Sequence, residues 1–225
     1  MKNSNNLTQE LIKYVLSQGA DLAGAAGTKT ISSERNLVHG DFKYVIVAAI
    51  RLSESVLAEI TDYPTKTYYH HYRTVNMALD QLALKIVRFL QAGGHKAFPV
   101  PASQLVDWEK QRGIFSHKHA AVEAGLGWLG RNNLLVTPDC GSQIRLVSVL
   151  TDAELDAGRP LDQDCGECRD CIDACPASAI ADDPAFFDHE RCYSQLDTFV
   201  RKKLAGQHIC GICVKACSPS RRKKL

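Results

Sequence analysis

Eight of the nine cysteines in this 225-residue chain lie in one stretch near its C-terminal end. A first run has the spacing C-x2-C-x2-C-x3-C and is followed directly by proline. A lone cysteine comes next, and a second run has the spacing C-x2-C-x3-C. The positions are, in order, Cys165, Cys168, Cys171, Cys175, Cys192, Cys210, Cys213 and Cys217. The stretch has few apolar side chains, so we expect it to be held together through its thiols rather than by a hydrophobic core.

The spacing of the first run is the bacterial ferredoxin pattern, in which three thiolates bind one 4Fe–4S cluster and the fourth binds another. By that pattern, one cluster takes Cys165, Cys168, Cys171 and Cys217, and the other takes Cys175, Cys192, Cys210 and Cys213. Structural zinc is the alternative, but zinc sites usually carry two C-x2-C pairs with a longer gap between them. The crowded first run and its Cys–Pro step favour two clusters, and therefore one-electron chemistry.

The composition is that of a globular protein, with 45% hydrophobic and 23% charged residues. No apolar run reaches the length of about 18 residues that a membrane-spanning helix needs. The first residues, MKNSNNLTQE, lack the basic and apolar regions of an export signal. With so many cysteines and no such signal, we expect metal ligation in the cytoplasm rather than disulfides, and no membrane partner.

Charge is unevenly distributed along the second half of the chain. Residues 152–190 contain 12 acidic residues and two arginines, whereas residues 201–225 contain eight Lys or Arg and no acidic residue. These segments can attract each other as solvated faces, or they can bind a charged partner such as an acidic electron donor. The terminal RRKK is too short to predict nucleic-acid binding.

Helix and strand patterns alternate before the cysteines, which predicts an α/β or α+β sheet domain. We expect helices at 7–22, 68–91 and 116–124, a buried strand at 43–50, and a strand near 95–103 whose prolines confine it to a sheet edge. The runs NLLVT and QIRLVSVLT, joined by PDCG, predict a hairpin. A Pro-, Asp- and Gly-rich passage follows, so the predicted domains are 1–155 and 156–225.

The segment EAGLGWLGRNNLLVTPDCGSQIRLVSVLTDAEL, residues 123–155, carries a family likeness. Together with the cysteine pattern, it resembles the cobalamin-dependent reductases that include epoxyqueuosine reductase, and more distantly the reductive dehalogenases. That family has AGLGW-[IL]-G-K here, followed by GS and T-D. The likeness covers residues 116–217, close to half of the chain, and YYHHY and KYVIVAAI extend it loosely toward the N-terminus.

The resemblance implies an α+β protein with a nitroreductase-like sheet domain, which holds a corrinoid (cobalamin), and a ferredoxin-like domain with two 4Fe–4S clusters. Electrons from a donor protein of the flavodoxin or ferredoxin type would pass through the clusters to the cofactor or to a small substrate. Flavin in place of the corrinoid follows only from the analogy of the sheet domain. A ferredoxin-type carrier with no substrate of its own is the alternative function.

The AGLGW segment supplies the candidate cofactor-binding residues. Its glycines permit close approach of the backbone, the indole offers a flat face, and the guanidinium can pair with phosphate. These residues are Gly125, Gly127, Trp128, Gly130 and Arg131. The alternative reading is a tight helix-to-strand turn with Trp128 in the core.

No catalytic residue is assigned. The related reductases have an aspartate shortly before AGLGW, and this chain has none there. Asp107, Glu109, His117 and His119 are the candidates that remain. The chain also lacks the C-terminal helical repeats with which the tRNA-modifying relatives engage RNA, which argues against queuosine biosynthesis and a nucleic-acid partner.

Other polar groups near the predicted sites have open roles. Cys140 is an inert half-buried thiol, a lower cobalt ligand or a redox-active group. The run Tyr68–Tyr72 can line a substrate pocket with at most two or three side chains if it is helical; otherwise it packs in a core or an interface. His189 and His208 lie near cluster cysteines, where they are surface residues or tune a potential.

Overall fold

The computed structural model describes residues 2–29, 31, 42–107 and 113–218. The chain forms two compact units whose segments alternate along the sequence. The sheet unit comprises Met1–Ile50, Asn76–Leu126 and Arg145–Leu161, and the cysteine unit comprises Arg51–Val75, Gly127–Ile144 and Asp162–Leu225. The sequence-based division at residue 155 stays a prediction. The candidate Glu109 and the tail 219–225 lie outside the described residues.

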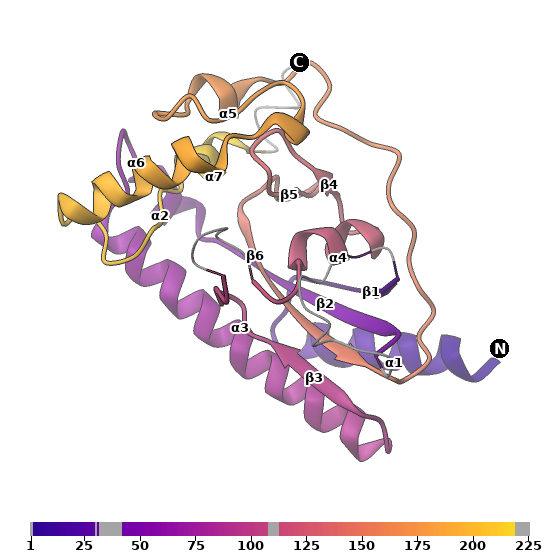
Figure 1. Ribbon diagram of the computed structural model, residues 1–225. Coiled ribbons are helices and arrows are strands. Elements are labelled where there is room, and N and C mark those ends of the chain that lie inside the picture. Colours follow the sequence, from indigo (N-terminus) through magenta and orange to yellow (C-terminus); the bar gives the residue numbers. More distant parts are fainter. Residues whose placement is uncertain (1, 30, 32–41, 108–112, 219–225) are drawn as a thin grey trace. The chain divides into compact units, whose positions relative to one another are not determined.

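A four-stranded sheet of order β1-β2-β6-β3 forms the centre of the sheet unit (Figure 1). Its strands are β1 (Leu22–Gly27), β2 (Tyr44–Arg51), β3 (Ala97–Val100) and β6 (Ile144–Thr151). β1 runs antiparallel to β2, and β3 runs antiparallel to β6. This sheet and its helices confirm the predicted α+β class.

Strand β2 is buried along nearly its whole length, since every side chain from Val45 to Ala49 is 0% exposed. A continuous apolar, β-branched run suits a strand that is covered on both faces. β3 lies at the sheet edge, where Pro99 has no N–H to leave unpaired. Both sequence-based expectations are confirmed.

Three helices complete the sheet unit or enter it: α1 (Lys2–Ser17), α3 (Lys66–Ala92) and α4 (His117–Glu123). α1 and α4 both contact β1. Ser116 caps α4, because its hydroxyl accepts a hydrogen bond from the amide of His119. α3 and α4 confirm the predicted helices, whereas α1 ends before Leu22. The segment LAGAAG forms β1 instead, and its Ala and Gly residues gave no strand signal.

The predicted hairpin around PDCG is wrong in its pairing. β5 (Leu135–Val136) pairs with β4 (Trp128–Leu129) in a separate two-stranded sheet of the cysteine unit, whereas β6 belongs to the four-stranded sheet. Gly141 and Thr137 bridge the PDCG turn, so the turn itself is present. A turn signal therefore located a chain reversal without identifying the strands that pair.

The cysteine unit is built from short helices: α2 (Glu54–Ala58), α5 (Asp170–Asp173), α6 (His189–Arg201) and α7 (Ile212–Ala216), with a 3-10 turn at Pro184–Phe186. Both α2 and α5 contact α7 (Figure 1). Asp188 caps α6 by accepting from the amide of Arg191, and Cys192 lies on the first turn of this helix. Within the described ranges, none of the helices combines the length and apolar character that crossing a bilayer requires.

Candidate metal centre

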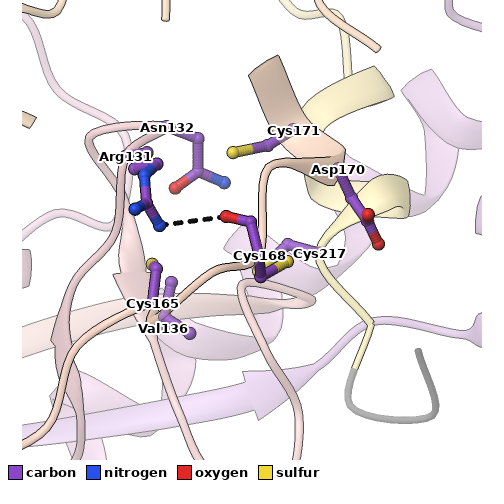
Figure 2. A pocket seen from close by; sticks show the side chains of 8 residues that line it. All are labelled: Arg131, Asn132, Val136, Cys165, Cys168, Asp170, Cys171 and Cys217. Atoms are coloured by element: carbon purple, nitrogen blue, oxygen red, sulfur yellow. Dashed lines mark hydrogen bonds between the residues drawn. The ribbon is translucent and has the colours of Figure 1, made fainter. Parts of the chain in front are cut away.

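Four cysteines of the cysteine unit line one pocket (Figure 2). The pocket measures about 310 Å³, including space open to solvent, and its lining residues are Cys165, Cys168, Cys171, Cys217, Arg131, Asn132, Val136 and Asp170. Cys171 is 8% exposed, and the other three cysteines are partly exposed. These four thiols are the set that the ferredoxin pattern assigns to a single cluster.

The backbone of the first cysteine run is wound into a tight turn. The amide of Cys168 donates to the carbonyl of Cys165 at 3.1 Å, and Gly166 has a φ of +50°, which favours glycine. Asp164 accepts from the amide of Gly166 at 2.7 Å. Cys217 caps the end of α7, and the contact of α5 with α7 brings this distant residue to the first run.

The second group of thiols is Cys175, Cys192, Cys210 and Cys213. Burial raises the pKa of Cys210 to about 12, and the negative charges of Cys192 and Cys175 add to it. Burial holds the pKa of Cys213 well above its usual value, and the charges of Cys210, Cys192, Cys171 and Cys175 raise it too, so Cys171 of the first run also lies near this group. Burial and the Cys175 thiolate also raise the pKa of Cys192. These four side chains therefore lie close enough to interact electrostatically.

The charges that raise the pKa of Cys171 come from the first group of thiols. Burial, followed by the charges of Cys217, Cys165 and Cys168, raises its pKa to about 12. Thiols in such surroundings hold their protons until a cation arrives, so metal binding must release protons here. The donor set is entirely sulfur, which suits iron–sulfur clusters or zinc.

None of the nine cysteines is in a disulfide. In the part of the chain that the structure describes, no three His, Cys, Asp or Glu side chains form a group that could hold a metal ion. A 4Fe–4S cluster takes one thiolate on each of four irons, so its ligands surround a larger body than one ion. The ligand assignment itself remains a prediction.

Arg131 lines the first pocket, and its guanidinium has partners within the protein, while its predicted pairing with a phosphate stays a prediction. Its guanidinium donates to the carbonyl of Cys168 at 2.9 Å (Figure 2) and to the carbonyl of Gly166 at 2.8 Å. Its Nε lies 3.6 Å from Asp182, which also pairs with Arg169 at 2.7 Å. The sequence showed Arg131 but gave no signal of this attachment to the cysteine loop.

The candidate cofactor glycines are tightly packed. A Cβ at Gly127 would stand 2.1 Å from the carbonyl oxygen of Val136, and one at Gly130 would stand 2.4 Å from the Val136 side chain. Trp128, between them, is 7% exposed in β4. In the sheet unit, Gly125 has a φ of +76° and approaches the Arg159 carbonyl. These contacts agree with the helix-to-strand turn, and the cofactor role stays a prediction.

Of the candidate acids, His117 has both ring nitrogens engaged. Its Nε2 donates to the carbonyl of Pro101 at 3.0 Å, so its Nδ1 accepts from the Ser148 hydroxyl at 2.8 Å. Burial lowers the pKa of His117 to about 4, and the charge of Arg145 lowers it further. Burial also lowers the pKa of His119, followed by the charge of Lys118. At neutral pH both rings are therefore neutral.

This state of His117 predicts a pH dependence of stability. Because its folded pKa of about 4 lies below the unfolded value near 6.5, the unfolded chain takes up the proton first as pH falls. We expect the free energy of unfolding of the sheet unit to decrease by about 1 kcal/mol between pH 7 and pH 5.5, and His117→Gln to remove this decrease. Denaturant unfolding at the two pH values measures it, with the exposed His70→Gln as control. If the unfolding free energy of His117→Gln falls between pH 7 and pH 5.5 as much as that of the unmodified protein, His117 is not the cause of the pH dependence.

The aromatic and histidine residues singled out above have structural partners in the cysteine unit. Tyr68 lies against Gly211, and Tyr69 lies against Gly206. His71 accepts from the amide of Ser53 at 2.9 Å. His208 stacks on Tyr193, with centroids 4.8 Å apart.

The cysteine unit also contains His189, Cys140 and Lys215, each of which has a partner in the same unit. Nε2 of His189 lies 3.0 Å from the Asn133 amide nitrogen. Cys140 is 6% exposed, and its amide donates to Thr137. Lys215, which the sequence reasoning missed, donates from Nζ to the carbonyls of Ala58 and Ile60, and so ties α7 to the end of α2.

Two kinds of curated protein are similar to this chain in sequence. An epoxyqueuosine reductase of Synechocystis sp. is 34% identical over 120 residues, which cover 49% of this chain and 41% of that protein. A tetrachloroethene reductive dehalogenase of Desulfitobacterium hafniense is 34% identical over 187 residues, which cover 76% and 30%. The chain is a homologue of epoxyqueuosine reductases and reductive dehalogenases. This confirms the family resemblance found in the sequence, although no protein-family model matches the chain.

Solved structures of both kinds of homologue share the fold. A reductive dehalogenase structure described as suggesting a mechanism for B12-dependent dehalogenation matches 95% of this chain and 32% of its own, with a TM-score of 0.73 at 18% identity. The epoxyqueuosine reductase of Streptococcus thermophilus matches 96% and 66%, with a TM-score of 0.64 at 22% identity. The chain spans less than half the length of the curated relatives described above.

Proposed function

We propose that the chain is a cytoplasmic iron–sulfur oxidoreductase that accepts electrons from a donor protein of the flavodoxin or ferredoxin type. Two 4Fe–4S clusters in a ferredoxin-like domain would pass them to a corrinoid or to a small substrate. The grouping of eight thiols into two sets of four supports this proposal most directly. The homologues are reductases, which agrees with an oxidoreductase.

The chain's own residues fit two clusters. Each set offers four thiol donors, and each combines the two cysteine runs: Cys217 joins the first run, and Cys175 joins the second. Buried thiolates repel one another, and the iron of a cluster offsets this repulsion. When bound, each cluster would supply one-electron transfer at a potential set by its surroundings. Pairing the runs in this way would also tie the cysteine unit together.

The corrinoid part of the proposal comes from the relatives, one of which is described by B12-dependent dehalogenation. In this chain, Val136 occupies the space beside Gly127 and Gly130 where a Cβ would stand. These two glycines therefore give no direct support to a corrin-binding site. The same observation favours the second candidate function, a ferredoxin-type electron carrier with no substrate of its own.

Anaerobic reconstitution with iron and sulfide tests these functions. The loaded protein is then mixed with hydroxocobalamin and, separately, with a reduced flavodoxin. Two clusters, cobalamin binding and oxidation of the donor would support the oxidoreductase. Two clusters with no cobalamin binding at near-millimolar concentration would leave the carrier. Zinc as the only metal, with no sulfide, would overturn both.

A further inference from the structure

The side chain of Arg131 is bound to the first cysteine loop by two hydrogen bonds. Two of its nitrogens donate to the carbonyls of Gly166 and Cys168, which belong to the turn that presents Cys165 and Cys168. Hydrogen bonds from a guanidinium are charge-assisted and about twice as strong as neutral ones. Its side chain is only 17% exposed, so water competes weakly for these bonds.

Asp182 forms an ion pair with the same guanidinium. Its Oδ1 lies 3.6 Å from Nε of Arg131 and 2.7 Å from NH1 of Arg169. The two arginines differ in their surroundings, because the Arg169 side chain is 55% exposed and donates to Asp182 rather than to the loop carbonyls in the described contacts. The same carboxylate therefore binds one arginine that reaches the cysteine turn and one that lies largely in solvent.

The charge of Arg131 also lies beside the four thiols. It lines the same pocket as Cys165, Cys168, Cys171 and Cys217 (Figure 2). Four thiolates around a cluster carry net negative charge, and adding an electron increases it. A fixed positive charge in a partly buried place favours the reduced form and so raises the reduction potential.

We propose that Arg131 is a positioning residue of the first cluster site. It fixes the turn from Cys165 to Cys168 in the conformation that binds metal, and it raises the reduction potential of that cluster. This inference rests on the proposed function only in requiring a cluster at this pocket. It gives Arg131 a role in the iron–sulfur site.

The test compares Arg131→Gln with Arg169→Gln, the matched control. Both variants remove one positive charge from Asp182, but only the first also removes the two hydrogen bonds to the loop. In Arg131→Gln we expect the amide of Cys168 to exchange faster in the protein as purified, iron to leave one of the two clusters about tenfold faster when a chelator is added, and one potential to become more negative. Arg169→Gln should match the unmodified protein, and Arg131→Lys should lie between.

Each outcome supports or overturns the inference. Equal iron loss and equal potentials in Arg131→Gln and the unmodified protein would overturn it, as would an equal effect of Arg169→Gln. If Arg131→Gln fails to fold, Arg131→Lys replaces it in the test. An intermediate rate of iron loss would then support the inference, and an unchanged rate would overturn it. An unmodified protein without any cluster would defeat the proposed function, while exchange of the Cys168 amide would still test the positioning role.

Discussion

A chain in which Cys165 and Cys217 are both replaced by alanine is expected to lose one cluster and keep the other. Iron per reconstituted chain should fall from roughly eight atoms to roughly four. The reason is that these two thiols line the same pocket, although they belong to different cysteine runs. Iron and sulfide analysis, together with electron paramagnetic resonance of the reduced protein, measures the loss.

The companion variant replaces Cys171 and Cys175, two neighbours within the first run. If each run held its own cluster, this pair would damage one site and the Cys165–Cys217 pair would damage both. We expect the reverse, with iron in the Cys171–Cys175 variant falling close to zero, because Cys171 lines the first pocket whereas Cys175 interacts with Cys192 and Cys210. Cys140→Ala, outside both sets, is the control and should keep both clusters. The opposite pattern of loss would refute the exchange of ligands.

Local patterns in the sequence predicted much of the fold. The apolar run of β2 and the long periodic helix α3 are properties of adjacent residues, so spacing alone located them. The cysteine spacing predicts two ligand sets. The members of the first set line one pocket, and their binding of a cluster stays a prediction.

What the sequence could not predict depends on residues that are distant along the chain. β1 was missed because its alanines and glycines gain their strand conformation from pairing with β2. The pairing of β5 with β4 was missed because a turn signal cannot identify the partner of a two-residue strand. The hydrogen bonds of Arg131 to carbonyls beyond residue 160 were missed because nothing in its sequence neighbourhood points to them.

Replacing Gly127 by alanine is expected to lower the free energy of unfolding by about 2 to 4 kcal/mol. The new Cβ would stand 2.1 Å from the carbonyl oxygen of Val136 and 2.9 Å from its carbonyl carbon, and a backbone held in the β4–β5 ladder cannot move aside cheaply. For a chain of this size, such a loss lowers the Tm by roughly 4 to 16 °C. Thermal unfolding, followed by cluster absorbance and circular dichroism, measures it.

Gly27→Ala is the matched control, because a Cβ at that glycine of β1 meets nothing within 4 Å. Its effect should stay within about 0.5 kcal/mol. The comparison separates two reasons for a glycine in the AGLGW segment. If Gly127 is there for packing, the alanine variant is unstable whether or not cobalamin is added. If it is there for close approach of a corrin ring, stability without cofactor is unchanged and only cobalamin binding weakens, which would restore the cofactor role to this loop.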